Sequence, residues 1–275
     1  MRITILTFGS RGDVQPLVAL GRGLKDQGHD VRLATHDVFR GFVESNGLSF
    51  APVAGNPVEL LSSPVGRAWV KAGRNPFKFL RNFVRLTRPS LPQVLNDSLA
   101  ASEGSDLIIY SVLSHAGYHI AEKMGIPSIA AGLQPMTPTS AFPSIGSPGD
   151  IGLPWLNRLG YFVVRQALWQ PFRRTVNDWR EHELGLPRLP FLGPYGTERL
   201  ETSLTVYGYS PSVLPKPQDW GPRVHVTGYW YLDHSHDWRP PERLARFLSE
   251  GGPPVYVGFG SMIRSGNLCR RNLPE

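Results

Sequence analysis

The chain has 275 residues, 41% hydrophobic and 19% charged, which is an ordinary globular composition with enough apolar mass for one large or two smaller domains. Its single cysteine, Cys269, excludes a disulfide within the chain. No signal peptide and no apolar run of ~20 residues is found, so we expect a cytoplasmic protein. The net charge of +7 favours an anionic partner.

The N-terminal part of the chain predicts strands that alternate with helices. Apolar runs and helical spacing predict a strand over 3–8, a helix over 17–24, a strand over 30–35, a helix over 39–46 and a strand over 48–53. This order implies a parallel sheet with right-handed crossovers.

The middle of the chain predicts a second set of alternating elements. Helices are expected over 65–87, on either side of Asn75-Pro76, and over 91–101, followed by a strand over 106–110, a helix over 116–124 and a strand over 127–131. A stretch rich in Pro, Ser, Thr and Gly over 134–154 predicts a long functional loop.

The rest of the chain is expected to add helices and strands and then begin a new unit. An amphipathic helical stretch is expected over 155–184, and its Trp155–Trp179 part is expected to shape a pocket together with the 134–154 loop. Further elements are predicted as strands over 204–207 and 224–227, a linker over 233–241, a helix over 242–249 and a strand beginning at Pro254.

The turn after the first predicted strand is the candidate site. It reads Phe8-Gly9-Ser10-Arg11-Gly12-Asp13, and ligands of open α/β sheets bind at the carboxyl ends of the strands. Gly9 and Gly12 are expected to take backbone angles that other residues avoid. The turn has neither the G-x-G-x-x-G nor the Walker pattern, which counts against a nucleotide-binding oxidoreductase.

These residues carry a family resemblance. GSRGDVQP over 9–16, followed by Gly28-His29-Asp30-Val31, resembles the N-terminal half of sterol and lipid UDP-glycosyltransferases, grouped by the glycosyltransferase family 28 N-terminal domain. VTGYW over 226–230 and PVYVGFGSM over 254–262 resemble that family's interdomain passage and the start of its second domain.

The resemblance implies an α/β fold of the GT-B type, in which two Rossmann-like domains face each other across a cleft. The N-terminal acceptor-binding domain would span 1–235, and a linker with the first piece of the donor-binding domain would span 236–275. The family's His- and Gly-rich donor motif and its later βα units do not occur in these residues. We therefore expect a truncated or frame-shifted product, or a fragment.

The resemblance also implies a reaction. A sugar would pass with inversion from a UDP-sugar or dTDP-sugar to a hydroxyl of a sterol, lipid or other apolar acceptor, without a metal or other cofactor. The alternative is a truncated relative that binds an apolar molecule and transfers nothing. Neither the acceptor nor the donor sugar can be read from the sequence.

Asp13 is the predicted catalytic base, because the reaction needs a group that removes the acceptor proton. Its structural alternative is an N-cap of the following helix, and one carboxylate can do both. Acceptor contacts are predicted for Ser10, Arg11, Gly12 and His115, and donor contacts for Gly260 and Ser261. Arg11 could instead pair with the diphosphate or with a nearby carboxylate, and His115 could be a solvated or core histidine.

A basic stretch without acidic residues lies between Leu60 and Asn96. It interleaves aromatic residues with Arg67, Lys71, Arg74, Lys78, Arg81 and Arg85. This composition is typical of a helix on an anionic membrane surface, and the alternative is a solvated basic face with its aromatics in the core. We predict no nucleic-acid partner, and no metal site, because the eight histidines form no metal-binding motif.

Overall fold

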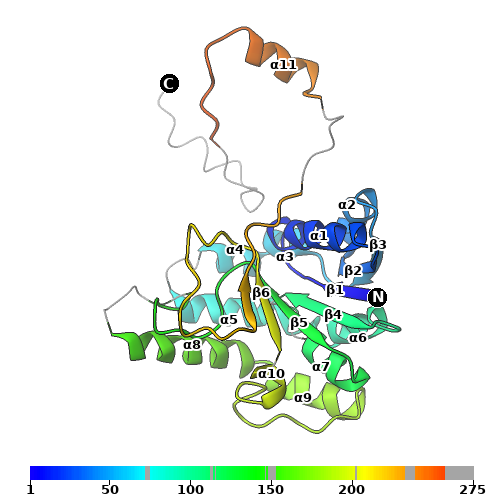
Figure 1. The fold of residues 1–275 in the computed structure, drawn as a ribbon, viewed down its shortest axis with the longest axis vertical. Helices are drawn as coiled ribbons and strands as arrows, with labels where there is room; N and C mark the ends of the chain where they lie inside the picture. The colour runs from blue at the N-terminus through cyan, green and yellow to red at the C-terminus, as the bar shows by residue number, and fades with distance from the viewer. Residues whose placement is uncertain are drawn as a thin grey trace.

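A parallel sheet of seven strands, in the order β3-β2-β1-β4-β5-β6-β7, forms the centre of the protein (Figure 1). The computed structural model describes residues 1–71, 75–111, 114, 116–145, 147, 153–201, 203–232 and 239–257. The strands are β1 Arg2–Leu6, β2 Asp30–His36, β3 Ser49–Val53, β4 Leu107–Ser111, β5 Ser128–Gly132, β6 Leu204–Tyr207 and β7 Val224–Val226.

The strand order reverses between β1 and β4. From β1 the chain adds β2 and β3 on one side, then returns to place β4 on the other side of β1. In register, Ile5 of β1 lies opposite Leu33 of β2 and Ile109 of β4. The carboxyl ends of β1 and β4 therefore form a topological switch point, where sheets of this kind bind ligands.

Helices cover both faces of the sheet (Figure 1). They are α1 Arg11–Asp26, the short 3-10 helix η1 Asp37–Phe39, α2 Arg40–Ser45, α3 Pro57–Ser62, α4 Pro64–Lys71, α5 Pro76–Thr87, α6 Leu91–Ala101, α7 Ala116–Met124, α8 Pro154–Trp169, α9 Arg173–His182, α10 Glu198–Glu201 and α11 Glu242–Ser249.

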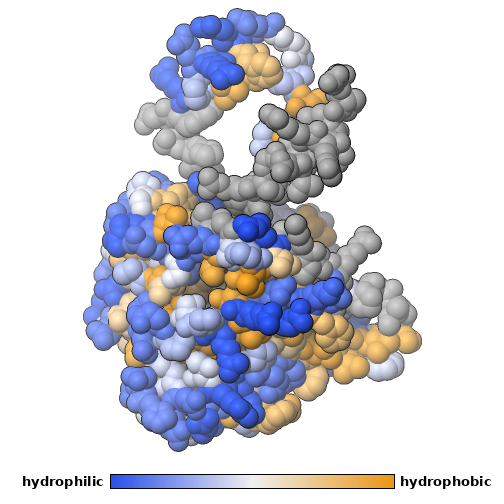
Figure 2. Space-filling view, turned by 180° about the vertical axis from the view of Figure 1, so that it is seen from behind, coloured by the Kyte–Doolittle hydropathy of each residue, from blue (hydrophilic) through white to orange (hydrophobic). Residues whose placement is uncertain are grey.

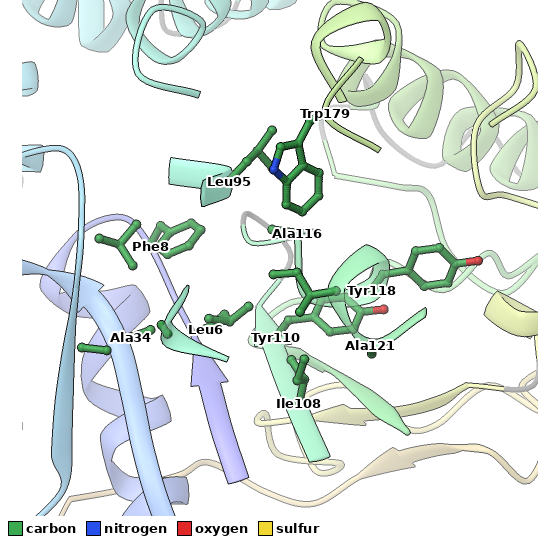
Figure 3. Packing of buried hydrophobic residues seen from close by; sticks show 14 of the residues in the cluster. Leu6, Phe8, Ala34, Leu95, Ile108, Tyr110, Ala116, Tyr118, Ala121 and Trp179 are labelled. Atoms are coloured by element: carbon green, nitrogen blue, oxygen red, sulfur yellow. The ribbon is translucent and has the colours of Figure 1, made fainter. Parts of the chain in front are cut away.

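Successive strand residues point to opposite faces, so the sheet supports two hydrophobic cores. Ile5 packs with Leu17 of α1 on one face. Its neighbour Leu6 packs on the other face, where Leu95 of α6 and Trp179 of α9 belong to the same cluster (Figure 3). Strands buried on both faces explain why β1 and β4 are almost continuously apolar.

Most predicted elements are confirmed, and the local signals explain their ends. The helical stretch over 65–87 does divide at Asn75-Pro76, where Oδ1 of Asn75 accepts a hydrogen bond from the Lys78 amide at 3.0 Å. The stretch over 155–184 forms α8 and α9. The described residues of the 134–153 segment contain neither helix nor strand.

Three expectations need correction. The first helix begins at Arg11 and not at Leu17, so the turn before it is shorter than predicted. The short helices α3 and α10 were not predicted. Residues 254–257 are exposed and form no strand, because no neighbouring strand among the described residues pairs with them.

Candidate functional site

The turn between β1 and α1 is built around the carboxylate of Asp13. Ser10 is the N-cap of α1, with φ −81° and ψ 175°, and Asp13 is the third helical residue. Oδ2 of Asp13 accepts hydrogen bonds from the Ser10 amide at 2.7 Å and from the Ser10 hydroxyl at 2.9 Å. Asp13 thus stabilises the helix start from inside the first turn, and the prediction that it is itself the N-cap is wrong.

Gly9 is required by this arrangement. Its φ is +120°, and a Cβ atom there would lie 2.5 Å from Oδ2 of Asp13. Gly12, in contrast, lies in the helix and has no positive φ, so the expectation of an unusual backbone conformation there is wrong. The Gly12 position faces only the Ser10 hydroxyl, 3.6 Å from where a Cβ would lie.

A cavity of about 320 Å³ opens beside this turn. Ser10, Asp13 and His36 line it at the carboxyl ends of β1 and β2. Most of its remaining wall is apolar and comes from α5, α6, α8 and the α8–α9 connection, including Phe83, Leu91, Leu95, Leu168, Trp169 and Phe172. The cavity is therefore an apolar compartment with a carboxylate at one end, a composition suited to an apolar ligand that carries a hydroxyl.

The other predicted contact residues differ in their placement. Arg11 places its guanidinium 4.6 Å from the ring centre of Phe42 and donates from Nε to Gln15, so this side chain is engaged along the helix. Neither Arg11 nor Gly12 lines the cavity. His115, Gly260 and Ser261 lie outside the described residues.

His36 is a site residue that the sequence analysis missed. It ends β2, is only 7% exposed and lines the cavity. Burial lowers the pKa of His36, although hydrogen bonds to the carbonyls of Val53 and Ala54 partly oppose this effect. A histidine at the carboxyl end of the strand beside β1 was a signal that could have drawn attention to it.

A buried ion pair holds the outer wall of the cavity. Arg180 of α9, 1% exposed, donates to Oε2 of Glu122 at 2.7 Å and to Nδ1 of His119 at 3.0 Å, both on α7. His119 and Val176 are lining residues of the cavity. The pair therefore fixes the position of α9 relative to α7 behind the cavity wall.

The loop after β5 is held by a second anchor. Asp219 accepts hydrogen bonds from the Thr139 hydroxyl at 2.6 Å and from the amide and hydroxyl of Ser140 at 2.8 Å, and it pairs with Arg158 of α8 at 3.1 Å. Desolvation raises the pKa of Asp219, but these donors outweigh it and hold that pKa well below the usual range.

The basic stretch divides into an inner and an outer face. On α5, Phe83 and Leu86 line the cavity, whereas Phe77 is 84% exposed beside the exposed Lys78 and Arg81. Of the other predicted basic residues, Arg67 and Arg85 are exposed, and Arg74 and the side chain of Lys71 lie outside the described residues.

Helix α8 is also divided. Its end, Leu168 and Trp169, lines the cavity, while its first turns expose an apolar stripe formed by Trp155, Leu159, Phe162 and Val163. Figure 2 shows apolar side chains gathered along the edge of the molecule where α8 runs. The expectation that the Trp155–Trp179 helices shape the pocket therefore holds only for their later part, and no described residue of the 134–154 loop lines the cavity.

The described residues contain neither a membrane-spanning helix nor a cluster of metal-binding side chains. No helix in those parts of the chain is long and apolar enough to cross a membrane. No group of three or more His, Cys, Asp or Glu side chains there could hold a metal ion.

The chain is similar to known proteins over most of its length. The profile of the glycosyltransferase family 28 N-terminal domain matches residues 3–143. Sterol 3-beta-glucosyltransferase of Neurospora crassa is 39% identical over 273 residues, and the sterol 3-beta-glucosyltransferase of Cryptococcus neoformans var. neoformans is 37% identical over 279 residues. Each match covers 96% of this chain but only 17% of the relative, so the chain spans about a sixth of their length.

Solved structures show the same fold. The glycotransferase of kitacinnamycin is 19% identical, with a TM-score of 0.56 over 88% of this chain and 55% of that chain. The calicheamicin glycosyltransferase is 15% identical, with a TM-score of 0.53 over 88% of this chain and 54% of that chain. The Rossmann-like sheet is therefore that of one half of a GT-B glycosyltransferase.

Proposed function

Because the chain belongs to glycosyltransferase family 28, we propose that it carries the acceptor-binding half of an inverting glycosyltransferase for apolar hydroxyl compounds. One observation supports this most directly: Asp13 borders a largely apolar cavity at the switch point of the sheet. Sterols are the favoured acceptor class, because two relatives are sterol 3-beta-glucosyltransferases. The co-substrate is a UDP-sugar or dTDP-sugar, with no cofactor.

In the proposed reaction, Asp13 is the base. Its Oδ2 is engaged by Ser10, and among the described residues no hydrogen bond reaches Oδ1. The acceptor hydroxyl would give its proton to the carboxylate as its oxygen bonds to the anomeric carbon. The bond from that carbon to the nucleoside diphosphate would break, and the diphosphate would leave with the electron pair. Ser10 would position the carboxylate and contact the acceptor.

Binding of cholesterol to the 275-residue chain tests the acceptor role. Leu168→Trp fills the cavity, and Leu159→Trp makes the same change on the exposed side of the same helix. We expect saturable binding by the natural chain and by Leu159→Trp, and binding about tenfold weaker by Leu168→Trp. No binding, or equal binding by both variants, would argue against this cavity as the acceptor site.

Transfer is a separate question from acceptor binding. Incubation with UDP-glucose and cholesterol asks whether this chain makes sterol glucoside. Binding without transfer would match the alternative of an acceptor-binding relative and would assign the chemistry to a chain that also contains the donor half.

We also propose contact with an anionic membrane surface through the outer faces of α5 and α8. The exposed Phe77 and the apolar stripe of α8 would enter the interface, and Lys78, Arg81 and Arg85 would face the lipid phosphates. Such a contact would bring the cavity close to an apolar acceptor dissolved in the membrane. The cytoplasmic location and the absence of a nucleic-acid partner stay predictions.

Flotation with vesicles of phosphatidylcholine and phosphatidylglycerol tests this contact. We expect salt-sensitive binding that is lost in the double variant Arg81→Glu/Arg85→Glu. Arg22→Glu/Arg239→Glu, which changes the net charge equally at other exposed positions, should still float. If both double variants lost vesicle binding equally, the binding would depend on net charge alone, and the proposed contact through α5 and α8 would be wrong.

A further inference from the structure

His36 joins three segments at the edge of the cavity. It ends β2, and both of its ring nitrogens have backbone partners. Nε2 lies 3.4 Å from the amide nitrogen of Gly9, and Nδ1 lies 3.1 Å from the carbonyl oxygen of Ala54. The ring centre is 5.8 Å from that of Phe8, the residue before Gly9. His36 therefore connects the turn that carries Asp13 to the segment after β3.

These contacts define the tautomer of the ring. A carbonyl oxygen can only accept, so Nδ1 must carry a proton and donate it to Ala54. The Gly9 amide can only donate, so Nε2 must be unprotonated and accept. His36 is thus held as the neutral Nδ1–H form, which agrees with the direction in which burial moves its pKa.

The same contacts argue against a role for His36 as a base. The nitrogen that could take a proton is already used by Gly9, and the other nitrogen is occupied by a backbone carbonyl. The segment after β3 packs closely on the ring, because a Cβ atom on Gly55 would lie 3.0 Å from Cε1 of His36. The ring is a structural connection beside the site.

We propose that neutral His36 is a positioning residue that fixes the Gly9 amide, and through it the turn that presents Asp13 to the cavity. Gly9 is the close neighbour of the Asp13 carboxylate, since a Cβ atom there would lie 2.5 Å from Oδ2. A proton on Nε2 would turn the acceptor into a donor facing the Gly9 N–H, so the turn would be released at acid pH. The expected loss of acceptor affinity at acid pH rests on the proposed function, whereas the hydrogen bond between His36 and the Gly9 amide does not.

Other titratable groups near this corner must be kept apart from His36. Asp13 of α1 lines the same cavity, and Asp97 of α6 accepts a hydrogen bond from the Ala54 amide at 2.8 Å. Asp37 is adjacent in sequence but is exposed and paired with Arg40. Variants of His36 leave all three carboxylates in place. Any pH dependence of cholesterol affinity that remains in these variants therefore comes from groups other than His36.

The first test is a pH titration of the isotopically labelled natural chain by NMR. We expect the His36 ring nitrogens to show the Nδ1–H form at pH 7.5 and to titrate below the 6.5 of an unperturbed histidine. The Gly9 amide resonance should shift with the same midpoint, while exposed His225 provides a reference ring in the same spectra. If the Gly9 amide resonance did not shift while His36 titrated, the proposal would be overturned.

The second test is cholesterol affinity at pH 7.5 and pH 5. His36→Gln keeps an acceptor oxygen that does not titrate, His36→Leu has none, and His225→Gln is the control. We expect cholesterol affinity to fall about fivefold from pH 7.5 to pH 5 in the natural chain and in His225→Gln, but to stay unchanged in His36→Gln. In His36→Leu we expect an affinity about fivefold lower than that of the natural chain at pH 7.5, at both pH values. An unchanged pH dependence in His36→Gln would contradict the positioning role. If no variant bound cholesterol at either pH, the sterol proposal would fail and the NMR titration would still decide the role of His36.

Discussion

At the residue scale, the site depends on how closely the Asp13 carboxylate approaches the backbone of its own turn. Oδ2 accepts two hydrogen bonds from Ser10, and Gly9 leaves the space that the carboxylate occupies. One side chain thus completes the helix start and faces the cavity.

Gly9→Ala is expected to destabilise the protein by ~1–3 kcal/mol, because the new Cβ meets Oδ2 of Asp13 and φ is +120°. Gly23→Ala on α1 is the matched control, since nothing lies within 4 Å of its added Cβ. That change should stabilise the protein by about 0.5–1 kcal/mol through helix propensity. Urea unfolding of both variants measures this, and equal effects would mean that the turn has no special need for glycine.

Asp13→Asn, made at the equivalent aspartate of a full-length relative, is expected to abolish transfer while leaving the fold intact. The amide oxygen can still accept from Ser10, but it cannot take the acceptor proton, so the rate should fall by at least about 10²-fold. The initial rate of sterol glucoside formation measures this loss. Asp26→Asn at the end of the same helix is the control, and retained turnover in the Asp13 variant would remove Asp13 from the chemistry.

At the element scale, two polar anchors, the buried Arg180 and the more exposed Asp219, hold helices that line the cavity and the loop after β5. Arg180 connects α9 to α7, and Asp219 connects the loop after β5 to α8. Tyr207 at the end of β6 supports the same loop, because its hydroxyl accepts from the amides of Met136 and Thr137. A segment without regular structure is therefore anchored by side-chain hydrogen bonds from two later parts of the chain.

Asp219→Asn is expected to cost ~1–3 kcal/mol at pH 7, because an amide group cannot accept from all the donors that surround the carboxylate. The folded pKa of Asp219 is depressed, so its stabilisation is present above the unfolded value near 4 and is lost as the pH falls further. Thermal unfolding of variant and natural chain should therefore converge below about pH 4. Asp26→Asn is the exposed control, and a difference that persists at low pH would contradict the ionic role.

Arg180→Met is expected to cost about 3–5 kcal/mol, because it leaves Glu122 without its buried partner. Arg174→Met, on an exposed position of the same helix, is the control and should change stability by less than about 0.5 kcal/mol. Chemical denaturation gives both values. If the Arg180 variant were as stable as the control, α9 would be held by its remaining contacts, such as the Trp179 hydrogen bond to Asn96.

At the scale of the whole molecule, the two cores on the faces of the sheet include no residue after Leu232 among the described residues. Helix α11 and residues 253–257 are exposed throughout, with Phe247 62% and Tyr256 91% exposed (Figure 1). Among the described residues, the stability of the protein therefore resides in residues 1–232.

Leu244→Ser/Phe247→Ser on α11 is expected to change the free energy of unfolding by less than about 0.5 kcal/mol, because both side chains already face solvent. Leu17→Ala in the core under α1 is the contrasting variant and should cost about 2–5 kcal/mol. Differential scanning calorimetry distinguishes them. A large loss in the α11 variant would show that its apolar face is buried in solution.

The order of the elements followed from the sequence because local signals are strong in this chain. Continuous apolar runs predicted the central strands, and Asn75-Pro76 predicted the division between α4 and α5. The GSRGDVQP turn and its family resemblance indicated the N-terminal domain of glycosyltransferase family 28, which the match over residues 3–143 confirms.

Only the tertiary structure decided which side chains meet at the site. His36 lies far from Gly9 in sequence and reaches it because β1 and β2 are neighbours in the sheet. Which turns of α8 line the cavity and which face solvent depends on where the fold places the helix, since its apolar positions extend beyond one face. Local patterns determine helices and strands through contacts between near residues, whereas a site is assembled from strand ends that the chain brings together only after the sheet has formed.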